Sequence, residues 1–279
     1  MKIILGTANF NEKYGILKNK FNNVHLNRLK DKIKKDNLFL DTAENYNNFD
    51  LIKKLGLKKR IFSKFKIILK KEKKIQLDKI ELNSHLNELN IEKFYGLMFH
   101  NSKDIFSFKK NQIKKFVISL KEKQITKFVG VSVYSPSEVK KVIKFFTPDF
   151  IQFPLNLFDK RFISKENIKI YKQKNIKLVA RSCFLQGIIL KKNFLFKNKE
   201  DTKIFNNFKM WLRKKKLSAL SASLNFIKNQ KQIDFLVVGV DNYFQLKQII
   251  NIFKSKKKID IPSFKNMSLQ SIDPRLWKK

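Results

Sequence analysis

Residues 38–46 read Leu-Phe-Leu-Asp-Thr-Ala-Glu-Asn-Tyr, a short apolar run that changes abruptly to polar side chains. A run without alternation of polar and apolar residues is typical of a parallel strand buried on both faces. The polar residues that follow it then lie at the carboxyl end of the strand. This pattern recurs along the chain, and its repetition indicates the fold.

The sequence contains eight such strand candidates, each short and rich in β-branched or aromatic residues. They are residues 2–5, 38–41, 60–64, 94–99, 128–131, 150–152, 177–180 and 234–238. Between them, apolar residues recur at three- and four-residue spacing, as on one face of a helix. Eight strands alternating with helices over roughly 250 residues predict an α/β fold, the closed parallel (β/α)8 TIM barrel, as a single domain over residues 1–279.

A doubly wound open sheet is the alternative architecture. It usually has a glycine-rich phosphate-binding turn after its first strand, whereas here that turn is Gly6-Thr-Ala-Asn-Phe without the G-x-G-x-x-G pattern. The clearest helices are predicted at 77–89, 113–120 and 139–146, the last with Ser135 as N-cap. Residues 190–216 predict a long loop and the seventh helix. His25 and His85 fall on predicted helices among lysines, and we expect both on the solvated surface.

The charge balance is extreme, with 62 Lys and Arg against 23 Asp and Glu and a net charge of +39. Only six of the 62 are Arg, the residue that nucleic-acid readers prefer for bidentate contacts. The lysines are spread along the chain, and Asn, Ile and Phe, which share A/T-rich codons with Lys, are also abundant. We therefore attribute the charge to codon drift on solvated helix faces and expect no specific nucleic-acid partner. The alternative is that the positive charge serves to bind polyanions, with an affinity that falls as the salt concentration rises.

Cysteine content and hydropathy predict a soluble, cytoplasmic protein without a membrane partner. Cys183 is the only cysteine, so an intramolecular disulfide and Cys-rich zinc patterns are excluded, and we expect no metal. We expect Cys183 to be a packed, inert thiol. No apolar run reaches the roughly 18 to 20 residues of a membrane span, and the opening apolar stretch is too short for a secretory signal.

Four polar residues occupy neighbouring strand ends. Asp41 and Tyr46 follow the second strand, Lys64 closes the third and His100 follows the fourth. Functional side chains of parallel barrels come from these ends and the loops after them. A neutral Tyr has a pKa of about 10, and an adjacent ammonium, held by a carboxylate, lowers it. A His opposite could orient a carbonyl, so the set predicts protonation of an oxygen that gains negative charge. Hydride from a nicotinamide supplies the missing nucleophile.

The ordered motifs resemble the aldo/keto reductase family along nearly the whole chain. They are LGTANF (5–10), LDTAENY (40–46), SK (63–64), MFHN (98–101), VGVSVY (129–134), IQFPLN (151–156) and VGVDN (238–242). The segments ARSCFLQG (180–187) and DPRLW (273–277) are similar to a bacterial branch often labelled as spore-coat or surface-polysaccharide related.

The resemblance implies reduction of an aldehyde or ketone with NAD(P)H, with NADP(H) favoured over NAD(H). It implies Tyr46 as general acid, Lys64 as the partner that lowers its pKa, Asp41 as the anchor of Lys64 and His100 as the carbonyl-orienting group. It also implies a set of cofactor-binding positions: Gly6, Thr7, Ser132, Gln152, Arg181, Gly239 and Asp241.

Four features depart from the family pattern. Val133 replaces the usual Asn after the Ser of strand five, and Arg181 replaces the aromatic that stacks on the nicotinamide. Arg181 could instead reach an anionic substrate group or a cofactor phosphate. Asp241 lies in the stretch where many family members have an Arg or Lys that holds the adenosine 2′-phosphate of the cofactor. The nearby Lys247 could supply that positive charge instead. The spacing from Tyr46 to Lys64 is also short, which indicates trimmed loops.

The expected partner is therefore a small-molecule carbonyl compound, for which the branch suggests a sugar or nucleotide sugar, and the expected state is a monomer or weak oligomer. A cofactor-holding sensor or scaffold subunit with weak or absent turnover is the alternative function.

Overall fold

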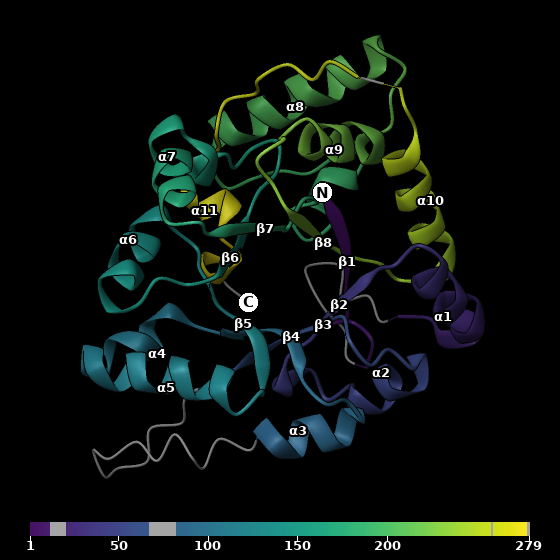
Figure 1. The fold of residues 1–279 in the computed structure, drawn as a ribbon. Helices are drawn as coiled ribbons and strands as arrows, with labels where there is room; N and C mark the ends of the chain where they lie inside the picture. The colour runs from purple at the N-terminus through teal and green to yellow at the C-terminus, as the bar shows by residue number, and fades with distance from the viewer. Residues whose placement is uncertain (12–20, 67–81, 258, 278–279) are drawn as a thin grey trace.

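The computed structural model describes residues 1–11, 21–66, 82–257 and 259–277. Within these ranges eight parallel strands close into a barrel in sequence order, which confirms the predicted fold (Figure 1). They are β1 (Lys2–Gly6), β2 (Phe39–Asp41), β3 (Ile61–Phe65), β4 (Phe94–Phe99), β5 (Thr126–Ser132), β6 (Phe150–Pro154), β7 (Lys177–Arg181) and β8 (Phe235–Gly239). β1 pairs with both β2 and β8, so Leu5 lies opposite Leu40 and Val238 and the ring has no free edge.

Helices surround the barrel (Figure 1). They are α1 (Leu26–Lys35), α2 (Phe49–Leu55), α3 (Leu82–Leu89), α4 (Ser102–Phe106), α5 (Lys110–Glu122), α6 (Pro136–Phe145), α7 (Lys165–Gln173), α8 (Lys199–Lys214), α9 (Ala219–Lys228), α10 (Tyr243–Lys254) and α11 (Leu269–Ile272). The loop and helix predicted at 190–216 are present, and α9 follows before β8. Beyond α10 the chain runs back along α8, where Asp201 accepts the Ser268 backbone N–H at 3.1 Å.

The predicted helices are present where the structure describes them. Ser135 caps α6 by accepting the backbone N–H of Glu138, as expected. α3 begins at Leu82, and the predicted turn at 77–81 lies outside the described residues. The surface prediction for His85 is wrong, because it shares one helix face with Leu82, Leu86 and Leu89 and is buried against the Phe49 ring at 5.3 Å. His25 is partly buried, with its ring 5.2 Å from that of Phe244.

Aromatic rings fill the interior of the barrel. Phe62 lies 5.3 Å from Phe150 and 5.4 Å from Phe235 between ring centroids, in edge-to-face geometry. Gly96 and Gly130 make room for these rings. A Cβ at Gly96 would lie 2.5 Å from Phe62, and one at Gly130 would lie 2.5 Å from Phe150. This layer forms the floor on which the polar strand ends rest.

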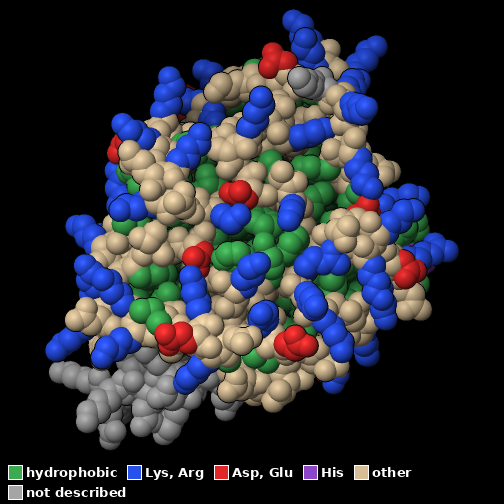
Figure 2. All heavy atoms as spheres, in the orientation of Figure 1, with side chains coloured by type: hydrophobic (Ala, Val, Ile, Leu, Met, Phe, Trp, Pro, Cys, Tyr) green, Lys and Arg blue, Asp and Glu red, His purple; other side chains and the backbone are tan. Residues whose placement is uncertain are grey.

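Basic side chains cover the visible face of the molecule in a dispersed pattern, with a few acidic ones among them (Figure 2). They do not form a single stripe on that face, which is consistent with solvated helix surfaces and with lysines spread along the sequence. Across the described part of the chain, every helix is too short or too polar to cross a membrane.

Candidate active site

The polar residues at the strand ends form the next interior layer above the aromatic floor. Side chains two positions apart on a strand point to the same face. The polar residues two positions after the interior Phe residues therefore also point into the barrel, at its mouth. These pairs are Phe39 and Asp41, Phe62 and Lys64, and Phe150 and Gln152. A cavity of about 550 Å³ opens there. It is lined by all four predicted catalytic residues and by six of the seven predicted cofactor-binding residues: Asp41, Tyr46, Lys64, His100, Gly6, Ser132, Gln152, Arg181, Gly239 and Asp241.

Asp41 and Lys64 form a buried ion pair at the centre of this layer. Their side chains are only 6% and 4% exposed, and the Lys64 ammonium donates to Asp41 Oδ2. Asp41 Oδ1 accepts a second hydrogen bond, at 2.8 Å, from the amide nitrogen of Gln152. The carboxylate thus ties β2 to β3 and β6 and fixes the Lys64 ammonium in place.

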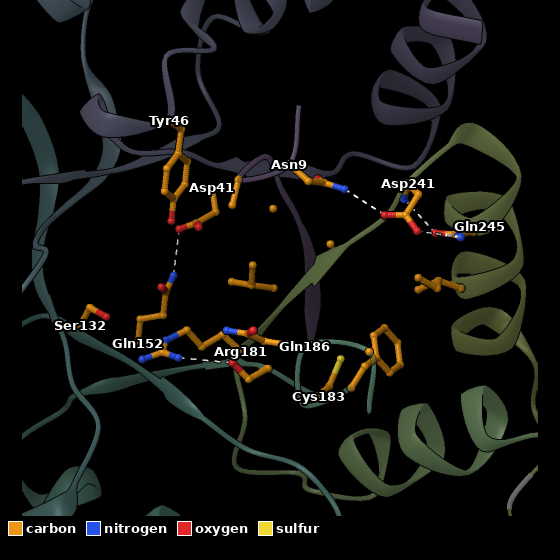
Figure 3. A pocket seen from close by; sticks show the side chains of 18 of the residues that line it. Asn9, Asp41, Tyr46, Ser132, Gln152, Arg181, Cys183, Gln186, Asp241 and Gln245 are labelled. Carbon is orange, nitrogen blue, oxygen red and sulfur yellow. Dashed lines mark hydrogen bonds between the residues drawn. The ribbon is translucent and has the colours of Figure 1, made fainter. Parts of the chain in front are cut away.

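Tyr46 reaches this pair from outside the barrel layer, on the short 3-10 helix Glu44–Tyr46 (η2). Its ring centroid lies 5.3 Å from the Lys64 Nζ and 6.4 Å from the His100 ring, and Figure 3 shows its hydroxyl pointing toward Asp41. The pKa of Tyr46 is raised, which is opposite to the expected direction. Burial and the negative charge of Asp41 raise it, and the positive charge of Arg181 opposes them. Lys64 does not lower this pKa, contrary to the expectation from the sequence.

His100 is a neutral hydrogen-bonding group in this environment. Its backbone N–H donates to the Phe65 carbonyl at 2.9 Å, which joins β4 to β3 just above the barrel. Burial, and then the positive charges of Lys64, Lys66 and Arg181, lower the pKa of His100 to about 4. Near neutral pH the ring can therefore donate one hydrogen bond to an oxygen without adding a charge.

Thr7 is the one predicted site residue that the structure places outside the cavity lining. It is fully buried, and its hydroxyl and backbone N–H both donate to the Asp41 carbonyl at 3.0 Å. Asn48, which the sequence analysis missed, donates to the Thr7 carbonyl at 2.7 Å and accepts from Thr42 at 3.0 Å. These residues fasten the loop that carries Tyr46 to β1, so Thr7 supports the site from behind.

The carboxyl ends of β5 and β6 offer groups suited to an amide. Asp41 can only accept hydrogen bonds, so it fixes the amide nitrogen of Gln152 toward itself and the Gln152 Oε1 away. That oxygen is buried, and no described residue donates to it. Ser132 ends β5 and lines the same cavity. An unsatisfied buried acceptor beside a hydroxyl fits the carboxamide of a nicotinamide, which carries both a donor and an acceptor.

Asp241 lies at the opposite end of the cavity, near α10, where two amide side chains contact it (Figure 3). Asn9 donates to Asp241 Oδ1 at 3.1 Å, and Gln245 donates to Oδ2 at 3.3 Å. Lys247 is exposed and does not line the cavity. Among the described residues, the cations that line the cavity are Lys64 and Arg181, and both lie at the end that holds Tyr46.

Arg181 stacks on an aromatic ring that the sequence analysis did not single out. Its guanidinium lies 4.2 Å from the centroid of Tyr134, and its Nη2 donates to the Val133 carbonyl at 3.3 Å. The guanidinium of Arg275, from the carboxyl-terminal DPRLW segment, lies 3.7 Å from the same centroid. The two segments that resemble the narrower bacterial branch therefore meet on Tyr134 at the mouth of the barrel.

The loop after β7 has an unusual backbone where it lines the cavity. Ser182, Leu185 and Gln186 all have left-handed φ angles, of 60°, 47° and 51°. Non-glycine residues in this region are sparse and cluster at functional sites. Cys183 is buried in the same loop, and burial raises the pKa of its thiol, in keeping with the predicted unreactive cysteine.

The family model described as the aldo/keto reductase family matches residues 2–267. The chain belongs to this family and is an oxidoreductase of the aldo/keto reductase type. No curated protein matches the sequence. Within the described residues, no group of three or more His, Cys, Asp or Glu side chains could hold a metal ion.

Solved structures share the fold at low identity. The chain is similar to an aldo-keto reductase from Bacillus halodurans in its holo form, with 14% identity, a TM-score of 0.69, and 93% of this chain and 88% of that chain covered. It is also similar to a glycerol dehydrogenase from Gluconobacter oxydans, with 17% identity, a TM-score of 0.65 and coverage of 92% and 87%. A third similar structure is a putative aldo-keto reductase from Pseudomonas aeruginosa, with 14% identity, a TM-score of 0.62, and 90% of this chain and 88% of that chain covered.

Proposed function

We propose that this protein reduces an aldehyde or ketone to an alcohol with NAD(P)H, and that Tyr46 donates the proton to the substrate oxygen. The observation that carries the proposal is the buried Asp41–Lys64 pair beside Tyr46, with His100 across the same cavity. A sensor or scaffold has no need of a proton donor next to a buried ion pair, so this geometry favours an enzyme over that alternative.

Each residue of the site has a role in this proposal. Neutral His100 hydrogen-bonds the carbonyl oxygen and directs it toward the Tyr46 hydroxyl. Lys64, held by Asp41, places a fixed positive charge where negative charge develops in the transition state. Ser132 and Gln152 hold the nicotinamide carboxamide, and Gly6 and Gly239 leave space along the wall. The cofactor, when bound, supplies hydride to the carbonyl carbon.

The proposed cofactor is NADP(H), on the basis of the family resemblance. One feature of the cavity favours NAD(H) instead. Asp241, with Asn9 and Gln245 around it, would repel a 2′-phosphate but would accept a hydrogen bond from a free ribose hydroxyl. Fluorescence titration of one protein preparation with NADPH and NADH measures the two dissociation constants and decides between them.

Substrate, domain limits and assembly are proposed from the sequence. The bacterial-branch resemblance of residues 180–187 and 273–277 supports a sugar-derived carbonyl and a role in polysaccharide synthesis. We propose that residues 1–279 form one catalytic domain that acts as a monomer or weak oligomer. Sugar aldehydes and ketoses, assayed with both cofactors, test the substrate, and sedimentation velocity tests the state of assembly.

Tyr46→Phe is the direct test of the proposed acid. The substitution removes one hydroxyl, so turnover of para-nitrobenzaldehyde should fall at least about 100-fold, while nicotinamide fluorescence still reports cofactor binding. Tyr171→Phe is the matched control, because the buried Tyr171 hydroxyl lies outside the cavity and has no hydrogen-bond partner among the described residues. A Tyr46→Phe enzyme with the unaltered rate would refute the assignment. Tight cofactor binding by the unaltered protein, with no turnover of any carbonyl, would favour the sensor.

A further inference from the structure

Arg181 brings an unusual charge to the proposed catalytic centre. Its guanidinium is held over Tyr134 and against the Val133 carbonyl, directly beside Ser132 at the end of β5. Figure 3 shows Arg181 and Gln152 at the same end of the cavity as Tyr46, whereas Asp241 and Gln245 lie at the other end. The arginine therefore lies at the end of the cavity where the proposed function places the carbonyl, and away from Asp241, the candidate for the ribose contact.

The charge of Arg181 is not balanced within the described site. Lys64 is paired with Asp41. Arg275, whose guanidinium also lies near the Tyr134 ring, is paired with Asp273 through Nη2 and Oδ2 at 2.6 Å. Among the described residues no carboxylate forms an ion pair with Arg181; its polar contacts are the Val133 carbonyl and the Ser182 hydroxyl, both at 3.3 Å. With His100 neutral, the catalytic end of the cavity carries one net positive charge.

A nicotinamide ring is a poor partner for this charge, because the ring becomes cationic on oxidation. An anionic group on the substrate is a good partner, since a guanidinium presents a planar fork of donors that matches a carboxylate or a phosphate. Stacking on Tyr134 also holds the fork in place before the substrate binds, which reduces the entropy lost on binding.

We propose that the carbonyl substrate of this protein carries an anionic group, a carboxylate or a phosphate, and that Arg181 binds this group. The inference rests on the proposed reductase function and adds the class of substrate. It makes Arg181 the residue that determines specificity and assigns it to the substrate instead of the cofactor.

The test compares carbonyl compounds that differ in charge. One pair is para-carboxybenzaldehyde and its methyl ester; the other is glyceraldehyde phosphate and glyceraldehyde, so the two pairs separate carboxylate from phosphate recognition. In the unaltered protein, kcat/KM should be about 10- to 100-fold higher for the anion of at least one pair, as expected for a hydrogen bond to a charged group. Arg181→Gln should reduce this ratio to near one, and Arg181→Lys should retain part of it.

Arg213→Gln is the matched control, because it removes the same charge from an exposed position on α8, away from the cavity. It should leave the ratio unchanged, which separates a contact at Arg181 from attraction of anions by the overall charge of +39. A ratio near one for both pairs in the unaltered protein overturns the proposal. So does an Arg181→Gln protein that keeps the ratio but loses cofactor affinity in a fluorescence titration.

A binding measurement separates failure of this inference from failure of the reductase function. Para-(hydroxymethyl)benzoate and its methyl ester, analogues of the alcohol product, are titrated calorimetrically into the protein mixed with oxidised cofactor. Selective binding of the carboxylate, lost in Arg181→Gln, supports the anion site even if no carbonyl is reduced. Equal binding of acid and ester counts against the site whether or not turnover occurs.

Discussion

Replacing Lys64 with Met removes the ammonium from the buried pair at the centre of the site. Both side chains of the pair are at most 6% exposed, so water solvates the remaining Asp41 carboxylate poorly. Among the described side chains, its remaining donor is the Gln152 amide at 2.8 Å. Breaking a buried pair by removing one partner typically costs about 3–5 kcal/mol. We expect Lys64→Met to lower the free energy of unfolding by this amount.

Urea unfolding followed by circular dichroism measures this change. The double variant Asp41→Asn/Lys64→Met removes both charges and should recover most of the loss, because a neutral amide is much cheaper to bury than a lone carboxylate. Lys140→Met is the control, since it breaks a solvent-exposed ion pair with Glu166 and should leave the unfolding midpoint nearly unchanged. A Lys64→Met loss below about 1 kcal/mol, or a double variant as unstable as the single one, would contradict the reasoning.

Three further predictions follow from the same structure. The native pKa of His100 is about 4 and its ordinary value is 6.5, so the unfolded chain binds more protons between these pH values. Stability should therefore fall as pH drops through that window, by up to about 3 kcal/mol from this group, and urea titrations of His100→Asn should show a shallower pH dependence. Gly130→Ala should lower the free energy of unfolding by about 1–3 kcal/mol, because the added Cβ meets the Phe150 ring. Gly239→Ala should leave the free energy of unfolding unchanged, because the added Cβ enters open space. Asp241→Asn should tighten NADPH binding about tenfold relative to NADH by removing a charge repulsion, and equal changes in the two fluorescence titrations would argue against this account.

The barrel and most of its mouth are predictable from local sequence, for a physical reason. Each strand is an apolar run buried on both faces, so its end is marked by the first polar side chain, and the parallel arrangement brings all these ends to one pole. Lys64 is therefore placed by strand position alone, whereas Gln152 enters the candidate site through the family resemblance. Their interior orientation follows from Phe62 and Phe150, two residues earlier on the same face.

The remaining features depend on contacts between distant segments. The carboxyl-terminal Arg275 meets Tyr134 only because the chain runs back along α8 to the barrel mouth, a route that no local pattern encodes. Asn48 is one Asn among many until the structure shows it joined to Thr7. The burial of His85 was within reach of the sequence, because the three- and four-residue spacing of its neighbours places it on the apolar face of α3.

The raised pKa of Tyr46 changes how the proposed acid should be understood. In the resting site, burial and Asp41 keep the phenol protonated, so the proton is available over the whole neutral range. Negative charge that develops on a substrate oxygen would be far more basic than a phenolate, so the proton can still move toward the substrate. In the proposed mechanism Lys64 acts as a fixed charge that favours the transition state, and Asp41 holds that charge in place. We therefore expect the pair to contribute to the proposed catalysis by position as much as by charge, so that an intact pair matters more than the resting acidity of Tyr46.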